Sequence, residues 1–363
     1  MRSHSLFLAQ GYKARGLLDI GGLLNYLCGV VMKLNTVICG DCLEIMRGME
    51  DNSVDCCITS PPYWALRDYG VEGQLGLEPT FQEYITRLCD IFDEVKRVLK
   101  KEGTCWVNMG DTYGGTGIGQ EKSMGSKAKQ TAGQYEDAKQ ARNIKNLSTK
   151  GKYDKCLLQI PSRFAIEMCN RGWILRNEII WHKPNCMPSS AKDRFTVDFE
   201  KIFFFTKSKK YWFETQYEKH LTQESRPDGI VREREYGYDT KYPEIRQKRK
   251  IDKTAKFFID KGSGGNINLP QPASKQGRNK RCVWEIPTKP YSEAHFAVYP
   301  EKLCEIPIKA GCPERGIVLD PFFGSGTTGL VAKTLHRNYI GIELNKEYIK
   351  IAESRLAQGV LGI

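Results

Sequence analysis

The 363-residue chain is long enough to bury a full hydrophobic core, and its 40% hydrophobic and 27% charged residues are typical of an ordinary globular protein. No apolar run is long enough to cross a bilayer, which excludes a membrane-spanning class. The 13 scattered cysteines favour free thiols in a reducing cytoplasm. The net charge of +12 favours a polyanionic partner, nucleic acid before membrane, over a merely solvated basic surface.

The first 31 residues are mildly apolar, but Lys13, Arg15 and Asp19 interrupt them, so a signal peptide is not expected. A regular pattern begins at Met32, and residues 1–31 are therefore predicted to be an N-terminal extension outside the main domain. Cys39 and Cys42 form a CxxC pair with no second pair or His cluster nearby, so no metal site is predicted.

Strands and helices are expected to alternate from Thr36 onward. The helix predicted over residues 80–100 carries a continuous apolar face, and the strand predicted over residues 53–60 is largely apolar. Such alternation is typical of a parallel sheet wrapped by helices. The elements expected in this first part are strands over residues 36–40, 53–60 and 103–110 and helices over residues 42–49 and 80–100.

Two polar stretches interrupt this pattern. Residues 113–155 are rich in Gly, Lys, Gln and Ser and predict a mobile loop or insertion, and residues 214–285 are again polar and basic. The main domain is therefore expected to combine residues 32–112, 156–213 and 286–363. The further elements expected are helices over residues 161–172, 330–336 and 345–358 and strands over residues 173–183, 199–213, 316–322 and 337–344.

A glycine-rich pattern, GxGxxG, spans Gly324, Gly326 and Gly329 between a predicted strand and a predicted helix, and Glu343 ends the next predicted strand. Such glycines let the backbone approach a ligand, and such a carboxylate can hold ribose hydroxyls. Asp320 stands where a pyrophosphate would arrive, so its charge disfavours a dinucleotide and favours an α-amino group. S-adenosylmethionine offers that amino group together with a ribose and a sulfonium. A nicotinamide cofactor, or a turn that binds nothing, stays open as an alternative.

The stretch Ser60-Pro61-Pro62-Tyr63-Trp64 follows a predicted strand and indicates a rigid corner, because proline stiffens the chain and removes backbone donors. Carbonyl oxygens before the prolines stay available as acceptors beside two aromatic rings. This combination suits a flat group that carries an amine. The alternative is a rigid turn that only packs two rings.

Two motifs together carry a resemblance to a known family. The stretch "TSPPYW", residues 59–64, followed far downstream by "DPFFGSGTTG", residues 320–329, resembles the amino-group DNA methyltransferases of the β class. The resemblance covers Thr36 to Leu356, and "GDCLEIM", "NEIIWHKPN" and "HFAVYPEKL" support it. It implies a Rossmann-like α/β fold, with a mostly parallel sheet and helices on both faces. It also implies a circularly permuted motif order and an inserted target-recognition region, placed here at residues 214–285.

The resemblance implies methyl transfer from S-adenosylmethionine to the exocyclic amine of a base extruded from double-stranded DNA. The Ser60 side chain and the Pro61 carbonyl would accept hydrogen bonds from that amine, with Pro62 completing the turn. Tyr63, helped by Trp64, would stack on the base. The implied cofactor-binding residues are Asp41, Thr59, Phe296, Pro300, Asp320, Phe322, Gly324, Gly326, Thr327 and Glu343.

Three of these assignments have an equal structural alternative. Asp41 is as well suited to cap the helix that follows it, and Phe296 and Pro300 are as well suited to packing. Ser60 and Asp320 both follow predicted strands, and ligands of open α/β sheets bind at the carboxyl ends of strands. Their two strands are therefore expected to be neighbours.

The target base is predicted to be cytosine, methylated at N4, because Ser60 stands where many adenine enzymes of this family carry Asp or Asn. Adenine N6 is the alternative. Methylation at cytosine C5 is excluded, because it needs a nucleophilic cysteine and the Pro-Cys dipeptide of that family is absent.

The basic stretches 120–155 and 207–281 are predicted to contact DNA phosphates, with a solvated basic surface as the alternative. Two rival functions remain at this stage, a nicotinamide-dependent oxidoreductase and a DNA-binding protein without a cofactor. A homodimer and a cognate restriction endonuclease are further candidate partners, and neither can be read from the sequence.

Overall fold

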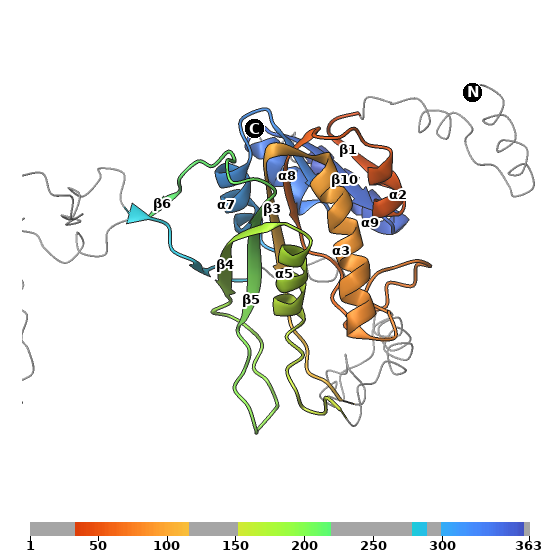
Figure 1. Cartoon of the computed structure of the whole chain (residues 1–363), viewed down its shortest axis with the longest axis vertical. Coiled ribbons are helices and arrows are strands. Elements are labelled where there is room, and N and C mark those ends of the chain that lie inside the picture. The colour runs from red at the N-terminus through yellow and green to blue at the C-terminus, as the bar shows by residue number, and fades with distance from the viewer. Residues whose placement is uncertain (1–32, 116–151, 219–277, 289–298, 359–363) are drawn as a thin grey trace, which may run out of the picture. The chain divides into compact units, whose positions relative to one another are not determined.

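The computed structural model describes residues 33–115, 152–218, 278–288 and 299–358 (Figure 1). The chain divides into two compact units, one formed by residues 1–214 with 281–363 and the other by residues 215–280. Of the smaller unit, the structure describes strands β6 (Tyr217–Glu218) and β7 (Arg278–Asn279), which pair antiparallel. The expected extension, residues 1–31, and most of the expected loop at residues 113–155 lie outside the described residues.

The larger unit is built on one eight-stranded sheet. All neighbouring strands in it are parallel except β5, which runs antiparallel to the strands on both of its sides. The predicted α/β fold with a mostly parallel sheet is therefore confirmed. In spatial order the strands are β1 (Thr36–Cys39), β10 (Asn338–Glu343), β9 (Ile317–Asp320), β2 (Val54–Thr59), β3 (Leu99–Met109), β5 (Phe199–Thr206), β4 (Ile174–His182) and β8 (Val283–Glu285).

Helices cover both faces of this sheet, as expected (Figure 1). Alternate strand residues point to opposite faces, so Cys57 and Cys105 belong to one hydrophobic cluster while Cys56 and Trp106 belong to the other. Helices α2 (Cys42–Arg47), α3 (Phe81–Val98) and α5 (Ile160–Asn170) cover the first face, and α7 (Glu301–Gly311), α8 (Thr327–Thr334) and α9 (Lys346–Gln358) cover the second.

Several boundaries differ from the sequence-based expectation, most of all in β5, which ends at Thr206 instead of residue 213. The helix expected to continue to residue 100 ends at Val98, because Leu99 is extended and begins β3. Helix α8 begins at Thr327 rather than 330, directly after Gly326, whose φ of 82° is left-handed. Strand β8 pairs with β4, so residues 283–285 belong to the main sheet and not to the recognition region expected to reach residue 285.

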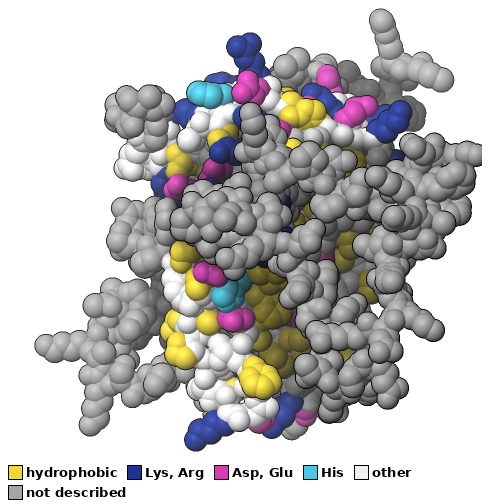
Figure 2. Space-filling view, turned by 90° about the vertical axis from the view of Figure 1, so that its left-hand side faces the viewer, with side chains coloured by type: hydrophobic (Ala, Val, Ile, Leu, Met, Phe, Trp, Pro, Cys, Tyr) yellow, Lys and Arg dark blue, Asp and Glu magenta, His cyan; other side chains and the backbone are white. Residues whose placement is uncertain are grey.

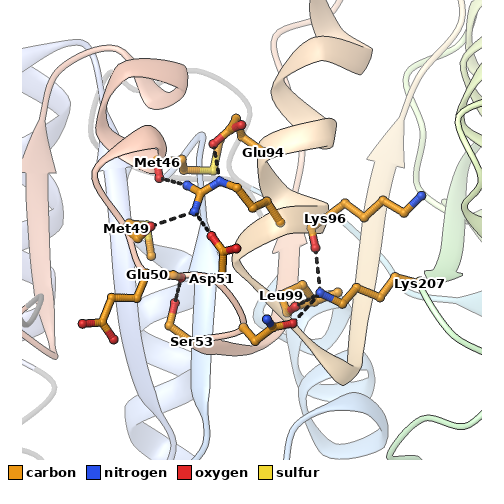
Figure 3. A network of polar contacts seen from close by, with 11 residues as sticks. Met46, Met49, Glu50, Asp51, Ser53, Glu94, Lys96, Leu99 and Lys207 are labelled. Carbon is orange, nitrogen blue, oxygen red and sulfur yellow. Dashed lines mark hydrogen bonds and ion pairs between the residues drawn. The ribbon is translucent and has the colours of Figure 1, made fainter. Parts of the chain in front are cut away.

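The amino-terminal ends of β2 and β3 are tied together by polar contacts (Figure 3). Near the end of α3, Arg97 donates hydrogen bonds to the carbonyls of Met46 and Met49, at 2.5 and 2.8 Å, and forms ion pairs with Asp51 and Glu94. These contacts fix the chain that enters β2 against the helix that leads into β3.

Strands β2 and β9 are neighbours, which confirms the expectation that the two motifs meet. From β2 the chain proceeds through α3 to β3 on one side, and from β9 it proceeds through α8 to β10 on the other. The sheet order therefore diverges between β2 and β9, and the two connecting helices, α3 and α8, lie on opposite faces. Such a switch point opens a crevice at the carboxyl ends of the strands, where ligands of open α/β sheets bind.

A prediction concerns the packing beneath this crevice. A Cβ atom placed on Gly341, in β10, would lie 2.4 Å from ring carbons of Phe323, which is buried and stacks on Tyr339. We expect Gly341→Ala to lower the free energy of unfolding by about 1–3 kcal/mol, the usual cost of overpacking a core. Denaturant titration measures this, with Gln82→Ala on the exposed side of α3 as the control. Equal stability of both variants would contradict the prediction.

Candidate active site

The two sequence motifs are joined by one buried hydrogen bond. Thr59, the last residue of β2, donates from Oγ1 to Oδ1 of Asp320, the last residue of β9, at 2.5 Å. Ser60 follows Thr59 directly, so the Ser-Pro-Pro-Tyr stretch and the glycine-rich loop leave the sheet side by side. The circular permutation therefore separates the motifs in sequence only.

The Asp320 carboxylate is enclosed by donors and only 1% exposed. Besides Thr59, it accepts hydrogen bonds from the Phe322 amide at 3.0 Å, the Thr328 hydroxyl at 2.6 Å and the Tyr299 hydroxyl at 3.2 Å. Burial raises the pKa of the Asp320 carboxyl, and the hydrogen bonds from Thr328 and Thr59 oppose that rise. The direct contact with an α-amino group that the sequence suggested needs an open carboxylate, and this arrangement encloses it.

Glycine occupies positions 324 and 326 of the loop for two different physical reasons. Gly326 has a φ of 82°, and a Cβ there would lie 2.9 Å from the Cβ of Ala352. Gly324 has a φ of 52° with open space where its Cβ would stand, and its amide donates to Glu343 Oε2 at 2.8 Å. Gly326 thus permits helix packing, and Gly324 leaves the backbone open to a ligand. Thr327 begins α8 with its hydroxyl bonded to Arg355 Nη1 at 3.1 Å.

Two carboxylates lie on one side of the loop, at the ends of β10 and β1. Glu343 is half-buried, accepts from the amides of Gly324 and Asn345 at 2.8 Å, and has its pKa raised by burial. Asp41 accepts from the amides at positions 43 and 44 through Oδ1, so its capping role is confirmed. The partnering of Cys39 with Glu343 in the parallel β1–β10 pair puts both carboxylates at one edge of the sheet. An open glycine backbone beside two carboxylates fits a ribose-bearing cofactor.

Tyr63 is held by a polar network from strands β3 and β5. Its hydroxyl donates to Glu200 Oε2 at 2.7 Å and accepts from Asn108 Nδ2 at 2.9 Å. Asn108 Nδ2 also lies 2.7 Å from Glu200 Oε2 and 3.4 Å from Ser60 Oγ, and Lys183 forms an ion pair with Glu200. Burial and the Glu200 charge raise the pKa of Tyr63, so the phenol stays neutral. The hydrogen bonds to Glu200 and Asn108 fix the orientation of its ring.

The interpretation of Trp64 as a base-stacking residue is wrong. Its side chain is 2% exposed, its ring packs edge-on against Phe81 at 5.9 Å, and its Nε1 donates to the Glu78 carbonyl at 2.9 Å. The turn at Pro61 and Pro62 sends consecutive rings in different directions. Tyr63 stays half-buried at the sheet edge, while Trp64 completes the core under α3.

Sequence reasoning missed four residues of this edge: Asn108, Lys183, Glu200 and Tyr299. Asn108 did carry a signal, since it is an amide within the apolar strand "TCWVNM". Its Oδ1 is buried and, among the described residues, has no hydrogen-bond partner, which is costly in a protein interior and often marks a functional site. Tyr299 lies beside the helix-capping Pro300 and joins α7 to Asp320 and Thr328.

Three further residues were predicted from the sequence to bind the cofactor. Phe322 is half-buried against the hydrophobic cluster beneath α2 and α3, Pro300 is buried, and Phe296 lies outside the described residues. Within the described ranges, no group of three or more potential metal ligands occurs. None of the helices in those same ranges is long and apolar enough to cross a membrane.

A prediction tests the bond that joins the motifs. Burial raises the pKa of the Asp320 carboxyl. The free energy of unfolding therefore falls as the pH rises and this carboxyl ionises. The Thr59 hydrogen bond limits that fall. We expect Thr59→Val to cost about 1.5–3 kcal/mol of unfolding free energy at neutral pH and less in mild acid. Thr86→Val, at an exposed helix position, is the control. An equal cost at both pH values would contradict this assignment.

Comparison with known proteins agrees with this geometry. The family model described as DNA methylase, for N6 and N4 methyltransferases, matches residues 54–354. Type II methyltransferase M.Cfr9I of Citrobacter freundii is 38% identical over 321 residues, covering 88% of this chain and 87% of that protein. Type II methyltransferase M.SmaI of Serratia marcescens is 36% identical over 320 residues, covering 88% and 90%.

Solved structures share the fold. PvuII DNA methyltransferase, titled cytosine-N4-specific, aligns with a TM-score of 0.54 at 19% identity, covering 90% of this chain and 88% of that one. TTHA0409 of Thermus thermophilus, complexed with S-adenosyl-L-methionine, aligns with a TM-score of 0.50 at 19% identity, covering 90% and 95%. The chain belongs to the DNA methylase family and is an S-adenosylmethionine-dependent methyltransferase acting on an exocyclic amine of DNA.

Proposed function

We propose that the protein methylates N4 of cytosine within a specific sequence of double-stranded DNA. The observation that carries the proposal is the Thr59–Asp320 hydrogen bond, because it brings Ser60 and the glycine-rich loop to one edge of the sheet. Ser60 in place of an acidic residue favours cytosine. The cytosine-N4-specific title of a structure with the same fold supports this choice by analogy.

The cofactor would lie between Asp41, Glu343 and the open backbone at Gly324. Its sulfonium supplies an electrophilic methyl group. Glu343 would accept hydrogen bonds from ribose hydroxyls through the carboxylate that already orders the loop. Asp320 would act as a positioning residue that locks this loop to β2, since its own oxygens are occupied.

The remaining cofactor assignments stay part of the proposal. Thr59 and Thr327 would act through the bonds that hold the two ends of the loop, and Gly326 by allowing α8 to begin there. Phe322 and Pro300 would line the crevice. Phe296, which lies outside the described residues, would line it as well.

To catalyse methyl transfer, the site would have to make the lone pair of the exocyclic nitrogen available. An exocyclic amine is a poor nucleophile because its lone pair is delocalised into the ring. The Ser60 hydroxyl, the Pro61 carbonyl and the Asn108 Oδ1 would accept hydrogen bonds from the amine and favour a pyramidal nitrogen. The lone pair exposed by these acceptors would be the nucleophile for the methyl group that the cofactor supplies, and the proton that the methylated nitrogen loses would pass to water.

Positioning would supply much of the rate. The Tyr63 ring is oriented before the substrate arrives, because Glu200 and Asn108 both bind its hydroxyl. A base taken out of the duplex could stack on that ring without further ordering of the protein. Pro62 contributes by its carbonyl, which accepts from the Tyr84 hydroxyl at 2.8 Å and fixes the turn.

The wider assignments complete the proposal. Residues within 120–155 and 207–281 would contact phosphates, and residues 214–282 would read the target sequence. The protein would work in the cytoplasm, paired with a restriction endonuclease of the same specificity, as the "Type II" names of its relatives suggest. Association into a homodimer is a further part of the proposal that sedimentation analysis would test.

The product identifies the base. DNA from cells that express the protein should contain N4-methylcytosine, at one sequence context, when its nucleosides are analysed by mass spectrometry and its modified positions by long-read sequencing. N6-methyladenine as the sole product would replace cytosine by adenine and leave the family assignment intact.

Substitutions in the Ser-Pro-Pro-Tyr stretch separate chemistry from cofactor binding. We expect Ser60→Ala and Tyr63→Ala each to lower kcat at least about 100-fold, the usual range for removing one group that acts in the transition state. The affinity for S-adenosylmethionine, measured by calorimetry, should remain. Ser53→Ala, at the opposite end of β2, is the matched control, since its hydroxyl only bonds the Glu50 carbonyl (Figure 3). Full turnover by either variant would contradict the assigned roles.

A further inference from the structure

The loop that joins β4 to β5, residues 183–198, carries the two most exposed large hydrophobic side chains among the described residues. Phe195 is 94% exposed and Met187 is 82% exposed, while Val197 is 48% exposed. The loop extends from the lower end of the sheet in Figure 1, beyond the carboxyl end of β4. These side chains are therefore available for contact with another molecule.

Contacts within the loop and to its neighbours hold it in shape. The Lys183 amide donates to the Asp198 carbonyl at 2.7 Å, and the Ser189 amide donates to Thr196 Oγ1 at 3.4 Å. The Arg194 guanidinium lies 3.5 Å from the centre of the Tyr113 ring. These contacts present the hydrophobic tip at the surface instead of folding it inward.

Both ends of the loop adjoin the residue proposed to stack on the target base. Lys183 begins the loop and pairs with Glu200, which comes two residues after the loop ends. Glu200 in turn accepts the hydrogen bond of the Tyr63 hydroxyl. A base stacked on Tyr63 would therefore lie near the base of this loop.

The charge around the tip favours a nucleic acid. Lys192 and Arg194 flank Asp193, and the Asp193 carboxylate is paired with Lys155 at 2.7 Å. Figure 2 shows hydrophobic side chains near Lys or Arg at the lower end of this face, with Asp or Glu beside them. Apolar side chains set among cations are the usual means by which proteins wedge between base pairs while holding phosphates.

We propose that the β4–β5 loop is a DNA wedge, in which Phe195 fills the space that the extruded base leaves in the duplex. Met187 would pack beside it, and Lys192 and Arg194 would contact the flanking phosphates. An apolar ring in the vacated space restores stacking for the neighbouring bases and so opposes return of the target base. This inference rests on the proposed function, because it requires an extruded base.

The test compares Phe195→Ala and Phe195→Leu with Ile166→Ala, a 63%-exposed residue on α5 that serves as the matched surface control. The probe is a duplex oligonucleotide of the methylated sequence with a fluorescent base analogue at the target position. We expect Phe195→Ala to lose about tenfold in duplex affinity and most of the fluorescence increase on binding. Phe195→Leu should retain most of both, and cofactor affinity and melting temperature should not change.

A second duplex, mispaired at the target position, sharpens the test. A mispair lowers the cost of extrusion, so it should restore much of the binding that Phe195→Ala loses. Wild-type behaviour of Phe195→Ala on both duplexes would overturn the proposal. So would a wild-type dimer that Phe195→Ala dissociates without changing the fluorescence, since the tip would then join two copies of the chain.

These outcomes are distinct from failure of the proposed function. If the wild-type product is N6-methyladenine, the base assignment is wrong, and the same comparison with an adenine analogue still decides the role of Phe195. If the wild-type enzyme methylates DNA without any fluorescence change, base extrusion and the wedge both fail while amino-group methylation stands.

Discussion

The hydrogen bond from Thr59 to Asp320 is the constraint on which the site depends. It is buried, it links two segments that are 261 positions apart, and it lies where the strand order of the sheet diverges. Four donors hold the Asp320 carboxylate, and one of them is the amide that begins the glycine-rich loop. The Ser-Pro-Pro-Tyr turn and the glycine-rich loop are therefore positioned by a single enclosed carboxyl group, whose pKa burial raises and these hydrogen bonds lower.

The sequence predicted those parts of the fold that depend on local pattern. The apolar face of α3 and the strand–loop–helix unit around Asp320 are encoded in contiguous residues, so their pattern is readable. The adjacency of β2 and β9 was also predictable, because both functional motifs must reach the same edge. Trp64 was misread because a proline turn does not reveal which of two consecutive rings faces the core.

The polar network around Tyr63 could not be predicted in the same way. Glu200 reaches Tyr63 only because β5 lies next to β3, and nothing local in the sequence states which strands become neighbours. Asn108 was readable as an unusual residue in an apolar strand, yet its partners come from two other segments. Contacts between distant strands depend on the global sheet order, which the sequence of each strand leaves undetermined.

The reversed direction of β5 has a mechanical consequence. Every other strand of the sheet ends at the functional edge, whereas β5 starts there, and so the hairpin it forms with β4 has both of its legs anchored in the sheet at that edge. The loop joins the paired strands at Lys183 and near Glu200, which form an ion pair, so a load on the loop would reach the sheet at these two residues. Contact of this loop with a bound duplex would thus be linked to the Tyr63 ring through Glu200, which accepts the hydrogen bond of the Tyr63 hydroxyl.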